Sequence, residues 1–354
     1  HELIIMEKDI IIYGAYGYTG ELIVRKCQEL GLKPLLSGRS ESKLKPVADK
    51  HGLPFHVASL NDADLDGLLQ GAKVVIHAAG PFIHTSKPMV EACIRNKVHY
   101  TDITGEIAVF AQASKYDAQA KEAGVMLLPG TGFDVVPSDC LAAHLKSRMP
   151  EADDLVLAFY GTGRASRGTS LTVVEGLGMG GTIRENGKIK QVQDAYDVKR
   201  FDFGPHNMSA VTIPWGDVCT AYFSTNIPNI KVYMGLPEKV IGSMKWGRWF
   251  GWLMRTEMVK GRARAKILAG KAGPSDEQRA KATTYLVGTV TNEAGKSVTS
   301  TIQTQEGYTL TAMTSVDIAQ KIASGNLKPG FQTPSLAYGK DIVCEVSGAQ
   351  FEDK

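Results

Sequence analysis

The pattern of apolar and polar residues gives the chain two parts of different texture. From Asp9 to Leu128, short apolar runs rich in β-branched residues alternate with segments whose apolar residues recur at helical steps. The expected strands are Ile10–Tyr13, Pro34–Ser37, Phe55–Ala58, Lys73–Ala78, Val98–Thr101 and Val125–Leu128, and the helices between them are Tyr18–Leu30, Glu41–His51, Asp62–Leu69, Ser86–Arg95 and Ala108–Glu122. Apolar strands that alternate with helices predict an α/β fold with a parallel sheet covered on both faces, a doubly wound Rossmann domain.

After Phe133 the pattern becomes one of alternating strands separated by turn residues. These strands are expected at Asp154–Tyr160, Val218–Thr225, Ile230–Met234, Lys281–Val290, Val298–Gln305 and Tyr308–Met313, with helices at Pro137–Ser147, Thr314–Ser324 and Pro334–Cys344. The turn cluster Asn292–Lys296 is typical of a hairpin. We therefore expect a Rossmann domain over residues 1–133, completed by 330–354. Residues 134–329 are expected to form an α+β substrate or dimerisation domain with a largely antiparallel sheet.

Composition narrows the class of protein. The 354 residues carry 40 Lys+Arg against 37 Asp+Glu, and 43% are hydrophobic, which is typical of a globular protein and gives no reason to expect nucleic acid as a partner. The five cysteines form no Cys-x-x-Cys pair, so we expect free thiols and no metal. The apolar patch Leu3–Met6 is too short for a secretory signal, and no run approaches the roughly 18 apolar residues of a membrane span. These features predict a cytoplasmic protein.

A glycine-rich turn follows the first expected strand directly. Gly14, Gly17 and Gly20 are spaced Gly-x-x-Gly-x-x-Gly, with Tyr16, Tyr18 and Thr19 between them. In a first βα turn, glycine lets a pyrophosphate approach the backbone, and the helix N-terminus offers N–H groups to the phosphates. The spacing differs from the Gly-x-Gly-x-x-Gly of many NAD enzymes, but its position predicts a dinucleotide site.

The end of the second strand indicates which dinucleotide binds. NAD-binding domains usually place an Asp or Glu about 20 residues beyond the glycine motif, where it accepts from the ribose 2′-OH. Here the strand ends in Gly38, Arg39 and Ser40, with no carboxylate before Glu41. Arg39, with Ser40 and Lys43 assisting, can hold a 2′-phosphate by charge-assisted hydrogen bonds. NADP(H) is therefore the expected cofactor; the alternative is that Arg39 is an ordinary solvated side chain.

Three further strand ends carry candidate residues. The fourth ends in Ala79, Gly80, Pro81 and Phe82, which could receive a ribose or nicotinamide or could form a simple turn, and His84 follows as an acid/base candidate. The fifth ends near Asp102 and Glu106, which could orient substrate or transfer a proton; alternatively, Thr104 or Glu106 caps the next helix. His77 lies within an apolar strand and is expected to be a core residue. After the sixth strand, Gly130–Asp134 is expected to be the hinge between the domains.

Two features of the second half suggest ligand contacts. The stretch Gly161–Arg164 followed by Arg167–Ser170 is glycine-rich and basic, so Arg167 and Thr169 could hold an anionic substrate group, or the stretch could be a loop with capping hydroxyls. Trp246, Trp249 and Trp252 recur every three residues among basic residues. This spacing predicts one helical face, which could form a core, a homodimer interface, a lid over an apolar substrate or a peripheral membrane contact.

The motifs together resemble those of the saccharopine dehydrogenase-like oxidoreductases, and more narrowly the branch with the mycobacterial trans-acting enoyl reductases. The resemblance is carried by Gly14–Gly20, Gly38–Ser40 with Leu44, Ala79–Phe82, His99–Glu106, Gly132–Asp139, Gly307–Ala312 and Thr333–Gly339. It implies a Rossmann domain that binds NADP(H), an α+β domain that closes over it, and hydride transfer. The implied cofactor contacts are Gly14, Gly17, Tyr18, Thr19, Gly20, Arg39, Ser40, Gly80, Pro81 and Phe82.

The leading functional hypothesis is therefore an NADP(H)-dependent oxidoreductase acting on a small molecule. No set of Arg and Lys residues suited to a dicarboxylic amino acid is evident, so an apolar or bulky substrate with a C=C, C=N or C=O bond is favoured over saccharopine. No tyrosine has Lys four residues later, which disfavours a short-chain reductase. Two alternatives stay open: an NADP-binding sensor without turnover, and a membrane-peripheral lipid-modifying reductase.

Overall fold

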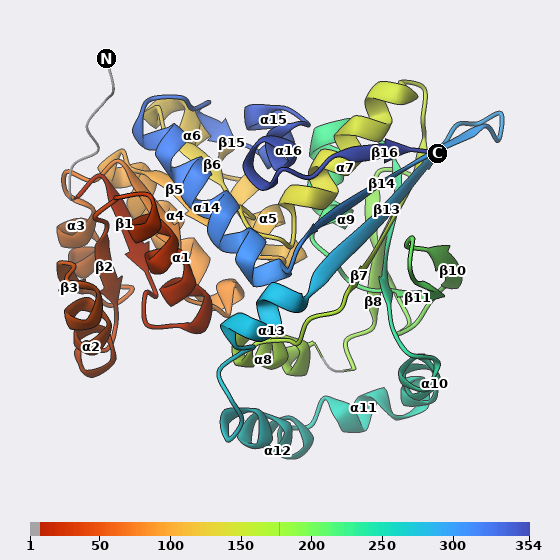
Figure 1. Cartoon of the computed structure of the whole chain (residues 1–354), viewed down its shortest axis with the longest axis horizontal. Coiled ribbons are helices and arrows are strands. Elements are labelled where there is room, and N and C mark those ends of the chain that lie inside the picture. The colour runs from red at the N-terminus through yellow and green to blue at the C-terminus, as the bar shows by residue number, and fades with distance from the viewer. Residues whose placement is uncertain (1–7, 177) are drawn as a thin grey trace. The chain divides into compact units, whose positions relative to one another are not determined.

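The computed structural model describes residues 8–176 and 178–354, so the patch Leu3–Met6 lies outside the described residues. The chain divides into two compact units (Figure 1). The first comprises residues 1–136 and 308–339, and the second comprises residues 137–307 and 340–354.

The first unit is built on a parallel sheet of seven strands. Their order is β15-β6-β5-β4-β1-β2-β3, and every neighbouring pair is parallel. The strands are β1 (Ile10–Tyr13), β2 (Leu35–Gly38), β3 (Phe55–Val57), β4 (Val74–His77), β5 (His99–Asp102), β6 (Met126–Leu128) and β15 (Gly330–Phe331). The strand order reverses between β1 and β4, which is where open α/β sheets bind ligands. The predicted α/β class and doubly wound sheet are confirmed.

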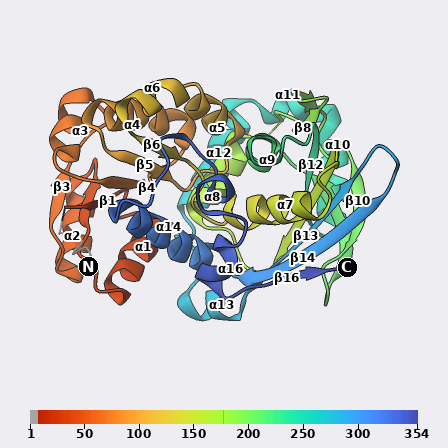
Figure 2. The same cartoon turned by 90° about the horizontal axis from the view of Figure 1, so that it is seen from above.

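Helices cover both faces of this sheet. They are α1 (Tyr18–Glu29), α2 (Glu41–His51), α3 (Asp62–Leu69), α4 (Phe82–Asn96), α5 (Ile107–Ser114), α6 (Asp117–Ala123), α14 (Gly307–Ala323) and α15 (Pro334–Tyr338). Figure 2 shows α3, α4 and α6 on one side of the strands and α1 and α14 on the other. The core on the α3–α4 side joins every second residue of the central strands, such as Ile11, Val75 and Leu127, to buried helix residues such as Leu65 and Met89.

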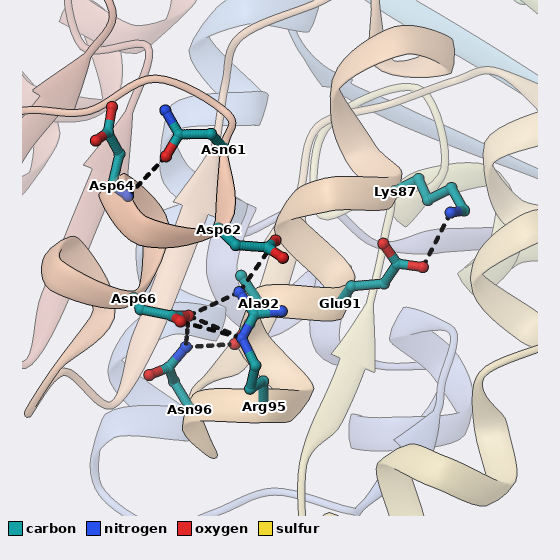
Figure 3. Close-up of polar contacts among 9 residues, drawn as sticks. All are labelled: Asn61, Asp62, Asp64, Asp66, Lys87, Glu91, Ala92, Arg95 and Asn96. Atoms are coloured by element: carbon teal, nitrogen blue, oxygen red, sulfur yellow. Dashed lines mark hydrogen bonds and ion pairs between the residues drawn. The ribbon is translucent and has the colours of Figure 1, made fainter.

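A polar network fixes α3 against α4 (Figure 3). Arg95 of α4 donates to Asp66 at 2.7 Å and to Asp62 at 3.3 Å, and the Asn96 amide also donates to Asp66. Asn61 caps α3 by accepting from the Asp64 amide at 2.9 Å. The network holds α4, whose N-terminus carries part of the site described below.

The second unit contains a nine-stranded sheet. The main path is β10-β11-β12-β7-β13-β14-β16, with β8 pairing β12 and β9. All pairs are antiparallel except β12 with β7, so the predicted largely antiparallel sheet is confirmed. The strands are β7 (Asp154–Gly161), β8 (Gly181–Glu185), β9 (Lys188–Val192), β10 (Val198–Asp202), β11 (Asn207–Thr212), β12 (Asn229–Gly235), β13 (Thr283–Thr291), β14 (Ser297–Gln305) and β16 (Phe351–Asp353). The predicted hairpin turn at Asn292–Lys296 joins β13 to β14.

The second unit also carries helices on its sheet and along one edge. They are α7 (Val136–Arg148), which begins in the first unit, α8 (Arg167–Glu175), α9 (Asp217–Thr225), α10 (Glu238–Gly247), the 3₁₀ helix η1 (Arg248–Phe250), α11 (Gly251–Met254), α12 (Glu257–Leu268), α13 (Asp276–Lys281) and α16 (Ile342–Ser347).

Two predicted strands are helices in the structure. Residues 218–225 lie in α9, and residues 308–313 form the beginning of α14. Over six residues, Tyr308–Met313 alternates like a strand. Over the whole of α14, however, the buried residues recur every three or four positions, as in Leu310, Thr314 and Ile318. The single helix predicted over Pro334–Cys344 is instead two short helices, with Gly339 ending the first at φ +88°.

The segment that returns to the first unit differs from the one expected. It is residues 308–339 and not 330–354, because α14 packs beside the loop after β6, where Thr314 donates to the Thr131 carbonyl at 2.6 Å. Residues 340–354 belong to the second unit, because β16 pairs with β14.

Three general expectations concern cysteines, metals and membranes. All five cysteines are free and four of them are buried. Within residues 8–176 and 178–354, no group of three or more His, Cys, Asp or Glu side chains could hold a metal ion. No helix in the same ranges combines the length and the apolar character needed to cross a bilayer.

Candidate dinucleotide site in the first unit

The glycine turn predicted from the sequence connects β1 to α1. Gly14 has φ +89°, and its amide donates to the Ser37 carbonyl of β2 at 2.8 Å, while the Gly17 amide donates back to the Gly14 carbonyl at 3.0 Å. Gly17 is the N-cap of α1, and no side chain caps the helix. The backbone therefore turns tightly at the end of β1 and presents the start of α1 at the carboxyl ends of the strands.

Two of these glycines are required by close packing. A Cβ on Gly14 would lie 2.8 Å from the Ala79 amide nitrogen, and a Cβ on Gly20 would lie 2.1 Å from the Gly14 carbonyl oxygen. Both neighbours are backbone atoms, so neither can move aside without moving β4 or the turn. Gly14 thus lets the end of β4 approach the turn, and Gly20 lets α1 pack against it.

The end of β2 gathers the residues expected at the adenosine end of the cofactor. The Tyr16 ring lies against Gly38, where a Cβ would be 2.4 Å from Tyr16 Cε1, and Lys43 Nζ lies 6.0 Å from the centre of that ring. Arg39 is exposed and has no hydrogen-bond or ion-pair partner among the described residues. The Ser40 hydroxyl lies 3.1 Å from the Ser42 hydroxyl. The end of β2 thus places Gly38 and Lys43 near the Tyr16 ring, and Arg39, the residue after Gly38, has no carboxylate paired to it among the described residues.

Glu106 has a structural role that differs from the one predicted. Its carboxylate accepts from the Phe82 amide at 2.9 Å and from the Ile83 amide at 3.0 Å, and so caps α4 from the neighbouring βα loop. The predicted alternative placed the cap on the helix that follows Glu106. The Glu106 side chain makes no such bond to α5, although the Glu106 amide donates to Thr104. A carboxylate at a helix N-terminus is favoured by the helix dipole.

The loop after β4 is also held from within the sheet. The peptide bond Gly80–Pro81 is cis. Thr85 donates to the Ala79 carbonyl at 2.7 Å, and its oxygen lies 3.0 Å from Nε2 of the fully buried His77. Burial lowers the pKa of His77 to about 3, so the imidazole is neutral and Nε2–H donates to Thr85. His77 is thus a positioning residue for this loop, whereas His84 lies exposed in the first turn of α4.

The fully buried Asp102 side chain connects neighbouring loops through hydrogen bonds. Its carboxylate accepts from the Tyr100 hydroxyl at 2.5 Å, the Thr104 amide at 3.0 Å and the Gly130 amide at 2.8 Å. Burial raises its pKa to about 6, against the lowering effect of these three donors. With its oxygens occupied in this way, Asp102 joins the loops after β5 and β6, which fits positioning better than proton transfer to a ligand.

Asp134 is the titratable group at these strand ends that the sequence analysis did not single out. Its carboxyl lies beside Gly105, where a Cβ would be 2.6 Å from Oδ2. Burial, and then the charge of Glu106, raise its pKa to about 7. The sequence showed Gly132-Phe133-Asp134 only as a hinge. The missed signal is Gly105 facing it, because a glycine in the β5 loop leaves room for this carboxyl.

The returning helix α14 places further residues beside the glycine turn. The rings of Tyr18 and Tyr308 meet edge to face, with centroids 5.2 Å apart. Thr311 accepts from the Phe133 amide at 2.9 Å. A segment far away in sequence therefore lies beside the N-terminus of α1. The sequence analysis did not predict this contact, because it interpreted the alternating pattern of Tyr308–Met313 as a strand.

The predicted substrate and membrane residues all lie in the second unit. Arg167 begins α8 and donates to the Gly270 carbonyl at 2.6 Å, and Ser166 caps the helix by accepting from the Thr169 amide at 3.2 Å. Arg167 faces a hollow of about 350 Å³ whose lining includes Arg164, Lys266 and Lys271. Thr169 therefore takes part in the capping alternative. Trp246, Trp249 and Trp252 lie in α10, η1 and α11, so they do not share a regular α-helical face.

Taken together, the first unit has the features that a dinucleotide requires. At the βα turn, a Cβ on Gly14 or Gly20 would collide with backbone atoms, so the turn leaves its backbone open to a ligand. At the end of the next strand lie the exposed Arg39 and Lys43, whose Nζ is 6.0 Å from the centre of the Tyr16 ring. The comparisons agree. Residues 10–128 match the family model described as the saccharopine dehydrogenase NADP binding domain. This segment belongs to that domain family. It runs from β1 to β6 and contains Gly14 to Gly20, Arg39 and Glu106, so a nicotinamide dinucleotide is the cofactor class that it supports.

Curated relatives and one solved structure extend this finding. The chain is 31% identical over 188 residues to a trans-acting enoyl reductase of Mycobacterium ulcerans (48% of this chain, 45% of the relative). It is 27% identical over 203 residues to the mouse saccharopine dehydrogenase-like oxidoreductase (50% and 47%). The predicted resemblance is confirmed, and the chain spans about half the length of the curated relatives it matches. Saccharopine dehydrogenase (L-Glu forming) of Saccharomyces cerevisiae shares the fold, with TM-score 0.66 over 98% of this chain and 100% of the yeast chain at 13% identity.

Proposed function

We propose that this saccharopine dehydrogenase-like protein is an NADP(H)-dependent oxidoreductase. It adds a hydride and a proton across a C=C, C=N or C=O bond of an apolar or bulky substrate, or catalyses the reverse reaction. The reduced nicotinamide supplies the hydride when bound, and the protein supplies binding, orientation and the proton. The names of the curated relatives, an enoyl reductase and an oxidoreductase, support this class of reaction.

The observation that carries the cofactor preference is the isolated Arg39. It lies at the end of β2, exposed and without a partner among the described residues, at the position where NAD-binding domains usually have an acid. A guanidinium matches the geometry of a phosphate and is always charged. Ser40 follows it in sequence and Lys43 lies in the first turn of α2, so both could assist Arg39 in holding the 2′-phosphate of NADP(H). NAD(H) would leave those charges uncompensated.

Asp134 is the proton donor that the geometry favours. It lies at the carboxyl ends of the strands beside the β5 loop, and it shares this place with the charge of Glu106. We assign positioning roles to Glu106, which caps α4 through two amides, and to Asp102, which joins the loops after β5 and β6. With a pKa of about 7, Asp134 is protonated under acidic conditions and still partly protonated at neutral pH, so it can act as a general acid there.

The test has two stages on the whole protein. First, NADPH and NADH are titrated by fluorescence against wild type, Arg39→Ala and the control Lys115→Ala, which removes an exposed cation elsewhere. We expect NADPH to bind more tightly than NADH, and only Arg39→Ala to lose this preference. Second, consumption of NADPH is followed with enone, imine and aldehyde substrates. Absence of NADPH binding would overturn the proposal, whereas binding without turnover would leave the NADP sensor.

A further inference from the structure

Helices α10, η1, α11 and α12, with the residues that follow, form an extended arm. The arm comprises residues 238–271, and its helices run one after another along the lower edge of the second unit in Figure 1. It is under a tenth of the chain, yet it holds eight of the seventeen large apolar side chains that are exposed in the described part of the protein. An apolar concentration of this kind is typical of an interaction surface.

Three tryptophans dominate this exposed surface. Trp246 is 74% exposed, Trp249 is 81% exposed and Trp252 is 70% exposed. They lie in three successive short elements, α10, η1 and α11, and each indole is exposed. The structure thus puts three large aromatic side chains into solvent where the sequence alone also allowed a core.

Other residues of the arm attach it to the rest of the second unit. Ile241 is buried against Ala195 and Val211. Arg248 Nε donates to the Asp194 carbonyl at 2.7 Å, Arg255 Nε to the Gly178 carbonyl at 2.7 Å, and Lys260 Nζ to the Glu175 carbonyl at 2.8 Å. These contacts attach the arm without using any of the tryptophans.

The arm also concentrates positive charge. It contains nine Lys and Arg against two Glu, whereas the whole chain has a formal charge of +3. Five of these cations are exposed and have no hydrogen-bond or ion-pair partner among the residues that the structure describes: Lys239, Lys245, Arg262, Lys266 and Lys271. A hollow of about 530 Å³ opens between Trp246 and Trp249, lined also by Lys245, Arg248 and Gln193. Cations beside indoles suit a phosphate head group at a lipid surface.

We infer that the arm docks on the surface of an anionic phospholipid bilayer. Tryptophan favours the boundary between head groups and acyl chains, and unpaired Lys and Arg are attracted to anionic lipids. A protein partner would be expected to bury the indoles in complementary pockets. In this protein the three indoles are exposed along the arm, and its unpaired cations are spread from Lys239 to Lys271. Such a spread of positive charge fits the wide anionic surface of a bilayer better than a single protein pocket. This inference does not depend on the proposed oxidoreductase activity.

The test is co-sedimentation of the whole protein with vesicles. One set contains phosphatidylcholine with about 30% phosphatidylserine, and the other contains phosphatidylcholine alone. We expect binding to the anionic vesicles, weakened by added salt. The triple variant Trp246→Ala/Trp249→Ala/Trp252→Ala should weaken it at least about tenfold. Lys239→Gln/Lys245→Gln should weaken it by about fivefold for each cation removed.

Matched variants separate docking from general charge and hydrophobicity. Lys115→Gln/Lys296→Gln makes the same charge change elsewhere, and Leu30→Ala/Ile189→Ala/Phe223→Ala removes three other exposed apolar side chains; both should bind like wild type. The substituted side chains are exposed, and circular dichroism checks that each variant folds. No binding to anionic vesicles, or binding that the tryptophan variant leaves unchanged, would overturn the inference. A concentration-dependent dimer that the tryptophan variant abolishes, without vesicle binding, would assign the surface to a second copy and also overturn it.

Discussion

The glycine turn of the first unit and the arm of the second unit differ in the size of their side chains. The turn is rich in glycine, whereas the arm is rich in exposed tryptophan. At the turn, side chains are absent because backbone atoms fill the space: a Cβ on Gly20 would lie 2.1 Å from the Gly14 oxygen. On the arm, large side chains are present and face solvent, with Trp249 81% exposed. The turn is thus specified by contacts within its own unit. The arm exposes apolar area that nothing in the described chain covers, which points to something outside the chain.

The substitution Gly20→Ala tests the close packing of the glycine turn, and we expect it to have the largest effect on stability and on NADPH binding. The added methyl group would overlap a backbone oxygen, so α1 must shift away from the turn. We expect the free energy of unfolding to fall by about 3 kcal/mol and NADPH binding to be lost. Urea unfolding and fluorescence titration measure the two effects. Gly67→Ala is the control, because a Cβ there meets nothing within 4 Å and helix α3 should gain slightly. Equal behaviour of the two variants would contradict the packing role of Gly20.

Asp134→Asn tests the buried carboxyl at the strand ends. Because its pKa is raised from 3.8 to about 7, the folded protein binds this proton more tightly than the unfolded chain. The stability contributed by the protonated group is therefore complete below about pH 4 and is lost as pH rises to about 7. We expect Asp134→Asn to be more stable than wild type near pH 8, by up to a few kcal/mol, with the difference shrinking towards pH 4. Urea unfolding across this range measures it, and a pH-independent difference would contradict the raised pKa.

The variant Asp134→Asn should lower turnover, although it raises stability near pH 8. If Asp134 donates the proton, wild-type reduction should decline above about pH 7, by about tenfold per pH unit at the alkaline end. Asp134→Asn should be strongly impaired at every pH while NADPH affinity stays near that of wild type. Unchanged kcat would exclude Asp134 as the donor.

A smaller effect is expected from Glu106→Gln. The amide keeps an acceptor for α4 but loses the charge that two backbone N–H groups share. We expect a loss of about 1–2 kcal/mol in the free energy of unfolding. The alkaline limb of the turnover profile should move to lower pH, because the charge of Glu106 helps to raise the pKa of Asp134. Glu122→Gln, an exposed carboxylate without a hydrogen-bond or ion-pair partner in the described chain, is the control and should change neither quantity.

How far the sequence predicted the molecule depends on whether the decisive contacts are local. The strands β1 to β6 of the first unit were predictable because short β-rich runs alternate with helical segments, and β1 was placed at its observed residues. The fold class followed from their alternation with helices. The strand β15 was not predicted, because it has only two residues. The bond from Glu106 to α4 and the meeting of Tyr18 with Tyr308 were not predictable, because they join residues 24 and 290 positions apart in sequence. Asp134 was passed over because its raised pKa comes from burial, which the sequence does not display.

The most direct test of the central claim is a cycle of four dissociation constants. NADPH and NADH are titrated calorimetrically against wild type and Arg39→Ala, so that the coupling between the guanidinium and the 2′-phosphate is isolated. We predict a coupling of about 2 kcal/mol, seen as a loss of NADPH affinity of roughly thirtyfold with NADH affinity nearly unchanged. Equal losses for the two nucleotides would contradict the assignment of Arg39 and, with it, the preference for NADP(H).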